Sequence, residues 1–143
     1  MFTIATYNIH YGKKIKEIPA AFGKDSHLQA AEIILFQEIE YHDTAEKAQA
    51  KHIADELGFE YRYAPARELK QGGTHGIALL SKHPILEYEV MRLPYFHTSF
   101  RTRERIAQLA LLDVSGTPVL VCNVHLDVRV NLMERIEQLK PVL

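Results

Sequence analysis

The sequence contains almost no cysteine and no long apolar run, and each of these absences excludes a class of protein. Cys122 is the only cysteine among 143 residues, so the disulfide frameworks that stabilise small secreted domains are excluded. Its place in the apolar run VLVCNV predicts a small, buried, hydrophobic side chain. No apolar stretch approaches the roughly 18 residues of a membrane span, and the amino terminus lacks a basic and then apolar leader. We therefore expect a soluble, cytoplasmic protein.

The sequence also lacks an excess of charge of either sign. The formal net charge is −1, from 17 Lys and Arg and 18 Asp and Glu. Binding of nucleic acid through bulk positive charge alone is therefore not expected, and any phosphate binding has to be local. Hydrophobic residues make up 47% and charged residues 24%, which is typical of a globular protein. The length predicts one domain over residues 1–143.

Apolar and β-branched residues recur in short runs separated by Gly, Pro or polar turns, which is the pattern of strands. Predicted strands cover residues 2–9, 33–38, 59–64, 76–81, 85–91, 105–114 and 118–124. The segment SGTP at 115–118 is suited to a hairpin between the last two strands. The predicted fold class is α/β (α+β), with a mixed, largely antiparallel β-sheet and helices packed on one face.

Two helices are predicted in the first half of the chain. Asp25 or Ser26 is placed to cap a short helix over residues 27–32. Asp43 and Glu46 resemble a capping box, which predicts that a second helix begins there. The apolar face of this second helix consists of Ala50, Ile53, Ala54 and Leu57.

Glycine and proline set the expected limits of these helices. Gly58 is placed to end the second helix. Gly12, Pro19 and Gly23 interrupt the region before the first helix, which is predicted to be less regular. A closing helix at about 131–140 is expected to direct its apolar residues inward, and these are Leu132, Ile136 and Leu139.

Three predicted strands end on polar side chains that suit phosphate and metal chemistry. These are Asn8 and His10, then Gln37 and Glu38, and then Asn123, His125 and Asp127. Ligand sites in layered α/β folds gather where strands end. An unpaired charge behind the apolar run at 33–36 would be costly, so Glu38 either reaches solvent or faces a cation such as Mg²⁺, which prefers oxygen ligands. Taken singly, each side chain also suits an ordinary surface or turn position.

Six segments in order carry a resemblance to a known family. They are TYNIHYG at 6–12, ILFQEIE at 34–40, GTHGIALLSKHPI at 73–85, RERIAQLALLDV at 103–114, VCNVHLD at 121–127 and ERIEQLKPVL at 134–143. Their order resembles the amino-terminal half of the endonuclease/exonuclease/phosphatase superfamily, whose best-known fold is that of DNase I. The resemblance implies one half of a four-layer α/β sandwich and a divalent-metal-dependent phosphoesterase that cleaves phosphodiesters or phosphomonoesters.

The resemblance also implies roles for single residues. Glu38 matches the glutamate that binds the catalytic Mg²⁺ or Mn²⁺, and Asn8 matches the asparagine beside that metal. His125 matches the histidine that contacts the scissile phosphate. Arg105 lies where many relatives have a phosphate-facing arginine, but other arginines in FRTRER at 100–105 leave this assignment open, and the segment also suits an exposed turn.

Two motifs of the family are absent from the sequence. Neither G-D-x-N nor S-D-H occurs, because none of the five aspartates follows a glycine or precedes a histidine. In the family these motifs supply the groups that handle the attacking water, including the general base. We therefore expect an incomplete site that is inactive or weakly active, and the alternative is a non-catalytic half-domain that acts as a binding or interaction module.

Half of such a sandwich is expected to leave a sheet face exposed. We therefore expect the chain to cover this face, either by self-association or by pairing with a separate chain that carries the carboxy-terminal half. The substrate is left open between nucleic acid and a small or lipid phosphodiester. The segment 91–105 contains aromatic residues and four arginines, so it is the best candidate for substrate contact, although it also suits a hydrated loop.

Overall fold

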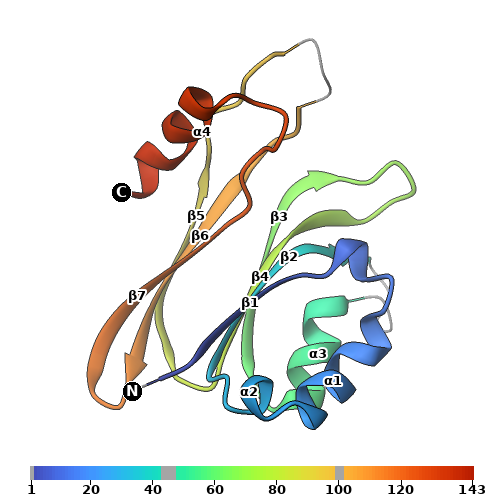
Figure 1. Ribbon diagram of the computed structural model, residues 1–143, viewed down its shortest axis with the longest axis vertical. Helices are drawn as coiled ribbons and strands as arrows, with labels where there is room; N and C mark the ends of the chain where they lie inside the picture. Colours follow the sequence, from blue (N-terminus) through green and yellow to red (C-terminus); the bar gives the residue numbers. More distant parts are fainter. Residues whose placement is uncertain (1, 43–47, 99–101) are drawn as a thin grey trace.

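The strands form two sheets that pack against each other (Figure 1). The computed structural model describes residues 2–42, 48–98 and 102–143. The first sheet has the strand order β1 (Ile4–Asn8), β2 (Ile33–Tyr41), β4 (Thr74–Ser81) and β3 (Glu60–Glu68). The second has the order β5 (Ile85–Arg92), β6 (Ile106–Val114) and β7 (Thr117–Val124). Only β1 and β2 pair in parallel among these described strands.

The predicted fold class is confirmed, and one feature of its arrangement differs. The sheets are mixed and largely antiparallel, and helices cover one face of the first sheet (Figure 1). The sequence pattern predicted one sheet, whereas the strands after Ser81 form a second sheet of their own. Periodicity within a strand indicates which residues share a face but not which strand is its neighbour, so this division was not predictable from the pattern.

The helices are α1 (Ile18–Lys24), α2 (Ser26–Gln29), α3 (Gln49–Leu57) and α4 (Leu132–Leu139). Helix α1 was not predicted, because Pro19 was interpreted as an interruption. Pro19 lies in the first turn of α1, where a missing N–H has no intrahelical role and proline is tolerated. Asp25 caps α2 as expected, accepting hydrogen bonds from the backbone N–H groups of His27 and Leu28.

Helix α3 ends as predicted, at a glycine in the left-handed conformation. Gly58 has φ 72°, and its backbone N–H donates to the carbonyl oxygen of Ala54. The predicted capping box of Asp43 and Glu46 lies outside the described residues. None of the helices in the described ranges is long and apolar enough to cross a membrane.

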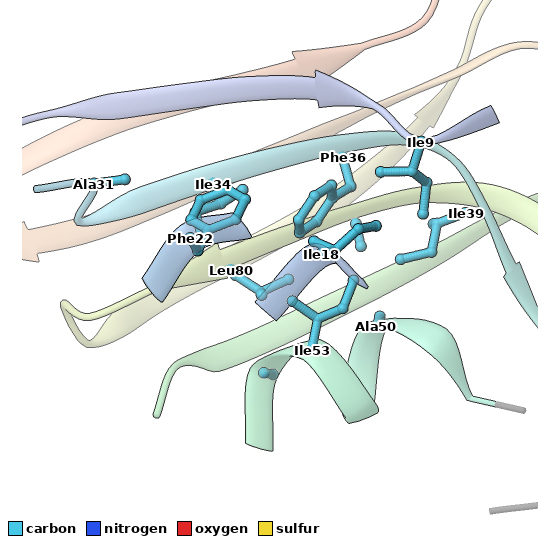
Figure 2. Packing of buried hydrophobic residues seen from close by; sticks show 12 residues of the cluster. Ile9, Ile18, Phe22, Ala31, Ile34, Phe36, Ile39, Ala50, Ile53 and Leu80 are labelled. Atoms are coloured by element: carbon cyan, nitrogen blue, oxygen red, sulfur yellow. The ribbon is translucent and has the colours of Figure 1, made fainter. Parts of the chain in front are cut away.

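Strand β2 is buried on both faces, which explains its almost continuous apolar sequence. On one face Ile34 and Phe36 pack against the helices, with Phe22 of α1 and Ile53 of α3 (Figure 2). On the other face Ile33, Leu35 and Leu79 pack against the second sheet, where they meet Ala110, Leu112 and Val121. The core therefore has two layers that share β2 and β4.

The inward face of the closing helix was predicted wrongly. Helix α4 has a capping box formed by Asn131 and Glu134, but Leu132 is 70% exposed and Ile136 is 41% exposed. The buried residue is Gln138, whose side-chain amide donates to the carbonyl oxygen of Pro94 and accepts from the backbone N–H of Asp127. Leu139, the third residue predicted to face inward, is half-buried. The buried contacts of the helix are thus the polar ones of Gln138, while Leu132 and Ile136 are exposed.

The prediction for Cys122 was also wrong. Strand alternation places Cys122 opposite Leu109, between the buried residues Val121 and Asn123 of β7. Its side chain therefore lies on the outer face of the second sheet and is exposed. The apolar run around it correctly indicated a strand, but it did not show that only one face of this strand is covered.

Candidate functional site

Glu38 lies in a β-bulge within β2, which continues to Tyr41 and so does not end at residue 38 as predicted. The register of β2 with β4 shifts between Gln37 and Ile39, so Glu38 is the extra residue, and its φ is 58°. A left-handed conformation costs a residue with a side chain roughly 1–2 kcal/mol, and such strain gathers at functional sites. The bulge removes Glu38 from the strand alternation that buries its apolar neighbours.

Two histidines face the Glu38 carboxylate. One oxygen, Oε1, lies 3.9 Å from Nε2 of His125, and the other, Oε2, lies 3.6 Å from Nδ1 of His10. Oε2 is buried and has no hydrogen-bond partner in the described part of the chain. Glu38 and His125, which the sequence singled out separately, therefore share one site.

Asn8 joins this site through His10. Its side-chain oxygen accepts a hydrogen bond of 3.0 Å from the backbone N–H of His10, in the turn directly after β1. His10 and Tyr11 both have positive φ, of 47° and 63°, in the short 3₁₀ turn η1 (His10–Gly12). Asn8 itself is exposed and is paired in register with Gln37. Its predicted place beside a metal stays a prediction.

Arg105 fixes the ring of His125. Its Nη1 lies 3.1 Å from Nδ1 of His125, and a guanidinium can only donate, so Nδ1 is the acceptor. The neutral imidazole then carries its proton on Nε2, which is the atom that faces Glu38. Burial, and then the charge of Arg105, lowers the pKa of His125, which favours this neutral form.

Asp127 holds the arginine segment in place. Its Oδ2 accepts from the backbone N–H of Arg103 at 2.8 Å and lies 3.8 Å from Nε of Arg105. Burial by itself would raise the pKa of Asp127, but hydrogen bonds from two backbone amides and the nearby guanidinium outweigh it and lower the pKa. Among the candidate arginines, Arg105 is thus the one that contacts His125, while Arg101 lies outside the described residues.

Asn123 and Gln37 connect the two sheets rather than line the site. Asn123 is 1% exposed, and its Nδ2 donates to the carbonyl oxygens of Phe36 and Ala78 and to Oε1 of Gln108. Its Oδ1 accepts from Nε2 of Gln37 at 3.0 Å. Both residues were predicted as strand-end groups for phosphate chemistry, and the structure gives them a role in holding β7 against β2.

Arg67 and His75 were not predicted, yet they lie beside Arg105 and His125. All four side chains line one small cavity of about 10 Å³, which has room for about one water molecule. His75 is 5% exposed, and burial, followed by the charge of Arg67, lowers its pKa to about 4. The sequence gave no signal for Arg67, because the alternation that predicted the strand at 59–64 stops before it.

A larger polar hollow shares one lining residue, Arg67, with this cavity. The hollow measures about 500 Å³. Its lining is mostly charged or polar, and consists of Tyr11, Glu40, His42, Arg67, Glu68, Leu69, Lys70, Gln71 and Arg103. Arg103 therefore represents the predicted substrate-contact segment 91–105 in this hollow.

A divalent metal is compatible with these residues only with help from other ligands. No group of three or more His, Cys, Asp or Glu side chains within the described ranges could hold a metal ion. Mg²⁺ needs fewer, because it is usually bound by one or two carboxylates together with waters and substrate phosphates. The unpartnered Oε2 of Glu38 suits that pattern, and the amide oxygen of Asn8, which accepts one hydrogen bond from the backbone N–H of His10, can accept another.

Solved structures share this fold. An endonuclease/exonuclease/phosphatase family protein from Leptotrichia buccalis superimposes on the whole chain with a TM-score of 0.76 and 12% identity, and 63% of that protein is covered. Sphingomyelinase C from Streptomyces griseocarneus superimposes with a TM-score of 0.71 and 17% sequence identity, and the match covers 97% of this chain and 56% of the sphingomyelinase. TDP2 from D. rerio, solved with a single-strand DNA product, superimposes with a TM-score of 0.68 and 17% sequence identity. The match covers 99% of this chain and 52% of TDP2.

These similarities confirm the predicted resemblance at the level of fold. No protein-family model matches the sequence, and no curated protein is detectably similar to it. The chain spans between about half and two thirds of the length of the three structures. The superposed part takes in both sheets of this chain.

Proposed function

We propose that this chain carries part of a divalent-metal-dependent phosphoesterase site, for hydrolysis of phosphodiesters or phosphomonoesters. The observation that carries the proposal is the strained, bulged Glu38, whose carboxylate faces His125 and whose Oε2 is buried without a hydrogen-bond partner among the described residues. A fold does not accommodate such a costly position without a reason, and a cation provides one. The similarity of fold to a nuclease-like family and to a sphingomyelinase supports the same reaction class.

Each side chain has a chemical role in this proposal. Glu38 would supply an oxygen ligand to Mg²⁺ or Mn²⁺, with Asn8 beside it, and the bound ion would act as a Lewis acid. His125 would donate from Nε2–H to a phosphoryl oxygen, and Arg105 would both hold that ring and add positive charge. These groups stabilise charge that develops on the phosphoryl oxygens.

Activation of the attacking water is the part that these residues do not supply. His75 is a poor base near neutral pH, because its pKa is about 4. His10 already faces the Glu38 carboxylate. We therefore propose that the 143-residue chain by itself is inactive or weakly active. The missing water-handling motifs are also what favours the second candidate function, a non-catalytic binding module.

The substrate and location are proposed more broadly. One similar structure contains a single-strand DNA product and another is a sphingomyelinase, so nucleic acid and small or lipid phosphodiesters are both candidates. The polar lining of the hollow beside Arg67 favours a polar leaving group over an acyl chain. A cytoplasmic location is part of the same proposal.

We further propose that a carboxy-terminal half of the domain, in the same chain or a separate one, covers the outer face of the second sheet. Leu109, Leu111 and Leu120 line an open hollow of about 480 Å³ there, and Leu120 is 65% exposed. Exposed apolar surface of this kind marks an interaction site. The similar structures are longer chains, which leaves residues to occupy this face. Without that half, the face is expected to drive self-association.

Metal binding gives the direct test of the proposed site. Isothermal titration calorimetry with Mg²⁺ should detect binding to the unmodified chain, and Glu38→Gln should weaken it by at least about tenfold. Glu89→Gln is the matched control, because Glu89 is an exposed carboxylate on β5. Equal Mg²⁺ affinity in the unmodified chain and the Glu38 variant would refute the proposed site.

A further inference from the structure

A shift in the register of β3 places Arg67 beside His75 of β4. The pairing of the two strands shifts between Pro65 and Arg67, so Ala66 is the extra residue and Arg67 pairs with His75. Bulges recur next to active sites because they redirect side chains. Residues that pair directly across two strands are close neighbours, so this shift is what brings the two polar side chains together.

Gly76 allows β3 to approach β4 closely at this point. A Cβ atom at Gly76 would lie 1.9 Å from the carbonyl oxygen of Ala64 and 2.9 Å from its carbonyl carbon. These are backbone atoms, so no side-chain rearrangement could relieve the overlap. The register that pairs Arg67 with His75 therefore depends on glycine at position 76.

Three buried nitrogen atoms around one cavity have no hydrogen-bond partner among the described residues. They are Nε of Arg67, Nε of Arg105 and Nε2 of His75. The three residues line the cavity of about 10 Å³ described above. Buried polar groups are almost always hydrogen-bonded in folded proteins, either to protein or to ordered water. These three atoms therefore indicate a ligand that contacts them together.

The Nε–H group of Arg105 finds no acceptor in the described part of the protein. The nearest carboxylate oxygen of Asp127 lies 3.8 Å from Nε, which is beyond hydrogen-bonding distance. The side chain of Arg105 is 11% exposed and its Nε is buried, so bulk solvent does not supply the acceptor. Because Nη1 of the same group contacts His125 at 3.1 Å, an acceptor in the cavity would fix both Arg105 and the histidine ring.

The size and lining of the cavity indicate a single water molecule. A volume of about 10 Å³ admits one water molecule. The guanidinium Nε–H groups only donate, so the ligand has to accept two hydrogen bonds, whereas Nε2 of a neutral histidine can accept one. His75 is neutral near pH 7, because burial lowers its pKa to about 4. Water can accept two hydrogen bonds and donate a third.

The charges near the cavity favour a neutral ligand over an anion. Glu104 also lines the cavity, although its side chain is 56% exposed and its Oε2 lies 3.4 Å from Nη1 of Arg92. The carboxylates of Asp127 and Glu38 act on Arg105 as well. The positive groups therefore already face carboxylates, and an anion would be repelled by these same carboxylates.

We propose that one water molecule binds in this cavity, where it accepts hydrogen bonds from Nε–H of Arg67 and of Arg105 and donates one to Nε2 of His75. Arg67 and His75 are then positioning residues, because the water that they bind fixes Arg105. Arg105 in turn holds the ring of His125. The water site requires no metal at Glu38, and only its value for catalysis rests on the proposed function.

Heteronuclear NMR of the unmodified chain, without any metal, tests the water site. The Nε–H protons of Arg67 and Arg105 should each show a nuclear Overhauser effect to a long-lived water molecule. They should exchange with solvent at least about tenfold more slowly than the Nε–H proton of Arg62, the factor expected for about one hydrogen bond. Arg62 is the control because it lies on the same strand, is 39% exposed and is absent from the cavity lining.

The ring of His75 gives a second readout in the same spectra. If Nε2 accepts from the water, the proton of the neutral ring lies on Nδ1. The ring of His125 should show the opposite tautomer, with its proton on Nε2, because Arg105 donates to its Nδ1. The ring nitrogen shifts distinguish these two forms.

Two substitutions at Arg67 separate the hydrogen-bond donor from the charge. Arg67→Met places a methyl group where Nε lies, so the Nε–H proton of Arg105 should lose its water contact and exchange about tenfold faster. The ring nitrogen shifts of His125 should change with it. Arg67→Gln is equally uncharged but keeps an N–H donor at the same position, so it should retain the water and the His125 shifts. Arg62→Met should leave all of these signals unchanged.

Several results would overturn the inference, once circular dichroism and amide chemical shifts show that each variant is folded. One is the absence of a water contact at either Nε–H group of the unmodified chain. Another is a proton on Nε2 of His75, which would indicate a ligand that only accepts, such as chloride. Unchanged Arg105 and His125 signals in Arg67→Met, or equal effects of Arg67→Met and Arg67→Gln, would refute the positioning role. A failure of Mg²⁺ to bind at Glu38 would instead refute the proposed function and would leave these signals as predicted.

Discussion

At the scale of single residues, Glu38 combines local strain with a carboxyl oxygen, Oε2, that is buried and unpartnered in the described part of the chain. Its identity and importance were predicted from the sequence, because a charge behind an apolar strand needs an explanation. The bulge that gives it φ 58° was not predictable, since nothing in QEIE departs from an ordinary strand pattern. The bulge is a shift in the register of β2 against β4, which depends on the pairing of the two strands in the assembled sheet.

This strain predicts that Glu38→Gly makes the fold more stable while it removes the metal ligand. Glycine adopts positive φ without cost and leaves no buried carboxylate, so the free energy of unfolding should rise by about 1 kcal/mol in urea titrations. Glu40→Gly is the control, because it lies in regular paired strand two residues on, and it should lower that free energy. A Glu38→Gly protein that is less stable than the unmodified chain would contradict the strain argument.

The buried His75 is expected to make the free energy of unfolding fall in acid. Its pKa is about 4 in the folded chain and near 6.5 when unfolded, so the unfolded state binds the extra proton between these values. The free energy of unfolding is therefore highest above about pH 6.5 and falls as the pH is lowered toward 4, by on the order of 3 kcal/mol from this residue.

Urea titrations across this pH range check the contribution of His75. His75→Gln cannot titrate, so its free energy of unfolding should depend less steeply on pH, by about one proton. The buried His125 also has a lowered pKa and should leave a residual slope in the variant. An identical pH dependence in the two proteins would show that His75 is not held neutral by burial.

At the scale of elements, most strands were predicted and their partners were not. The run 33–36 and the alternation in 59–64 identified β2 and β3, because side-chain periodicity is local. Helix α1 was missed because Pro19 is disruptive only inside a helix and not in its first turn. The inner face of α4 was predicted wrongly, because Gln138 is buried through two backbone hydrogen bonds that no hydropathy pattern encodes.

The hydrogen bonds of Asn123 are expected to contribute strongly to the free energy of unfolding, because they join the two sheets. Asn123 bonds to β2, β4 and β6 at once, and Asn123→Ala would leave several buried groups without partners. The free energy of unfolding should fall by about 2–5 kcal/mol, at roughly 1–3 kcal/mol for each unsatisfied group. Chemical denaturation measures this loss directly.

The neighbouring residue gives the control for this prediction. Cys122 is exposed on the opposite face of β7, so Cys122→Ala should change the free energy of unfolding by no more than about 0.5 kcal/mol. If Asn123→Ala were as mild as Cys122→Ala, the buried network would not be what joins β7 to the first sheet.

At the scale of the whole molecule, the packing of the two sheets brings Glu38 of the first sheet close to His125, which follows the last strand of the second. It also leaves the outer face of the second sheet exposed, where Leu109, Leu111 and Leu120 line a hollow. Sedimentation velocity should detect association that increases with concentration, driven by the leucines of the second sheet. Leu120→Glu should reduce this association, whereas Val128→Glu should not, because Val128 is exposed but lies outside the leucine hollow. A strictly monomeric unmodified chain at every micromolar concentration would contradict the exposed-face proposal.

The resemblance found in six short segments extends, at the level of fold, over the whole chain. What it could not supply was the pairing of His75 with Glu40 on one side and with Arg67 on the other, because this pairing follows from shifts in the register of β2 and of β3 against β4. The position of these residues depends on register, which is a property of the assembled sheet.

The central claim is that a divalent cation binds at Glu38, and paramagnetic broadening by Mn²⁺ tests it most directly. In amide NMR spectra, substoichiometric Mn²⁺ should first broaden the signals of His10, Glu38 and His125, which come from three separate segments: the turn after β1, the bulge within β2 and the residues after β7. Glu38→Gln should abolish this pattern and leave the rest of the spectrum unchanged. Broadening centred elsewhere, or the same broadening in the Glu38 variant, would contradict the account.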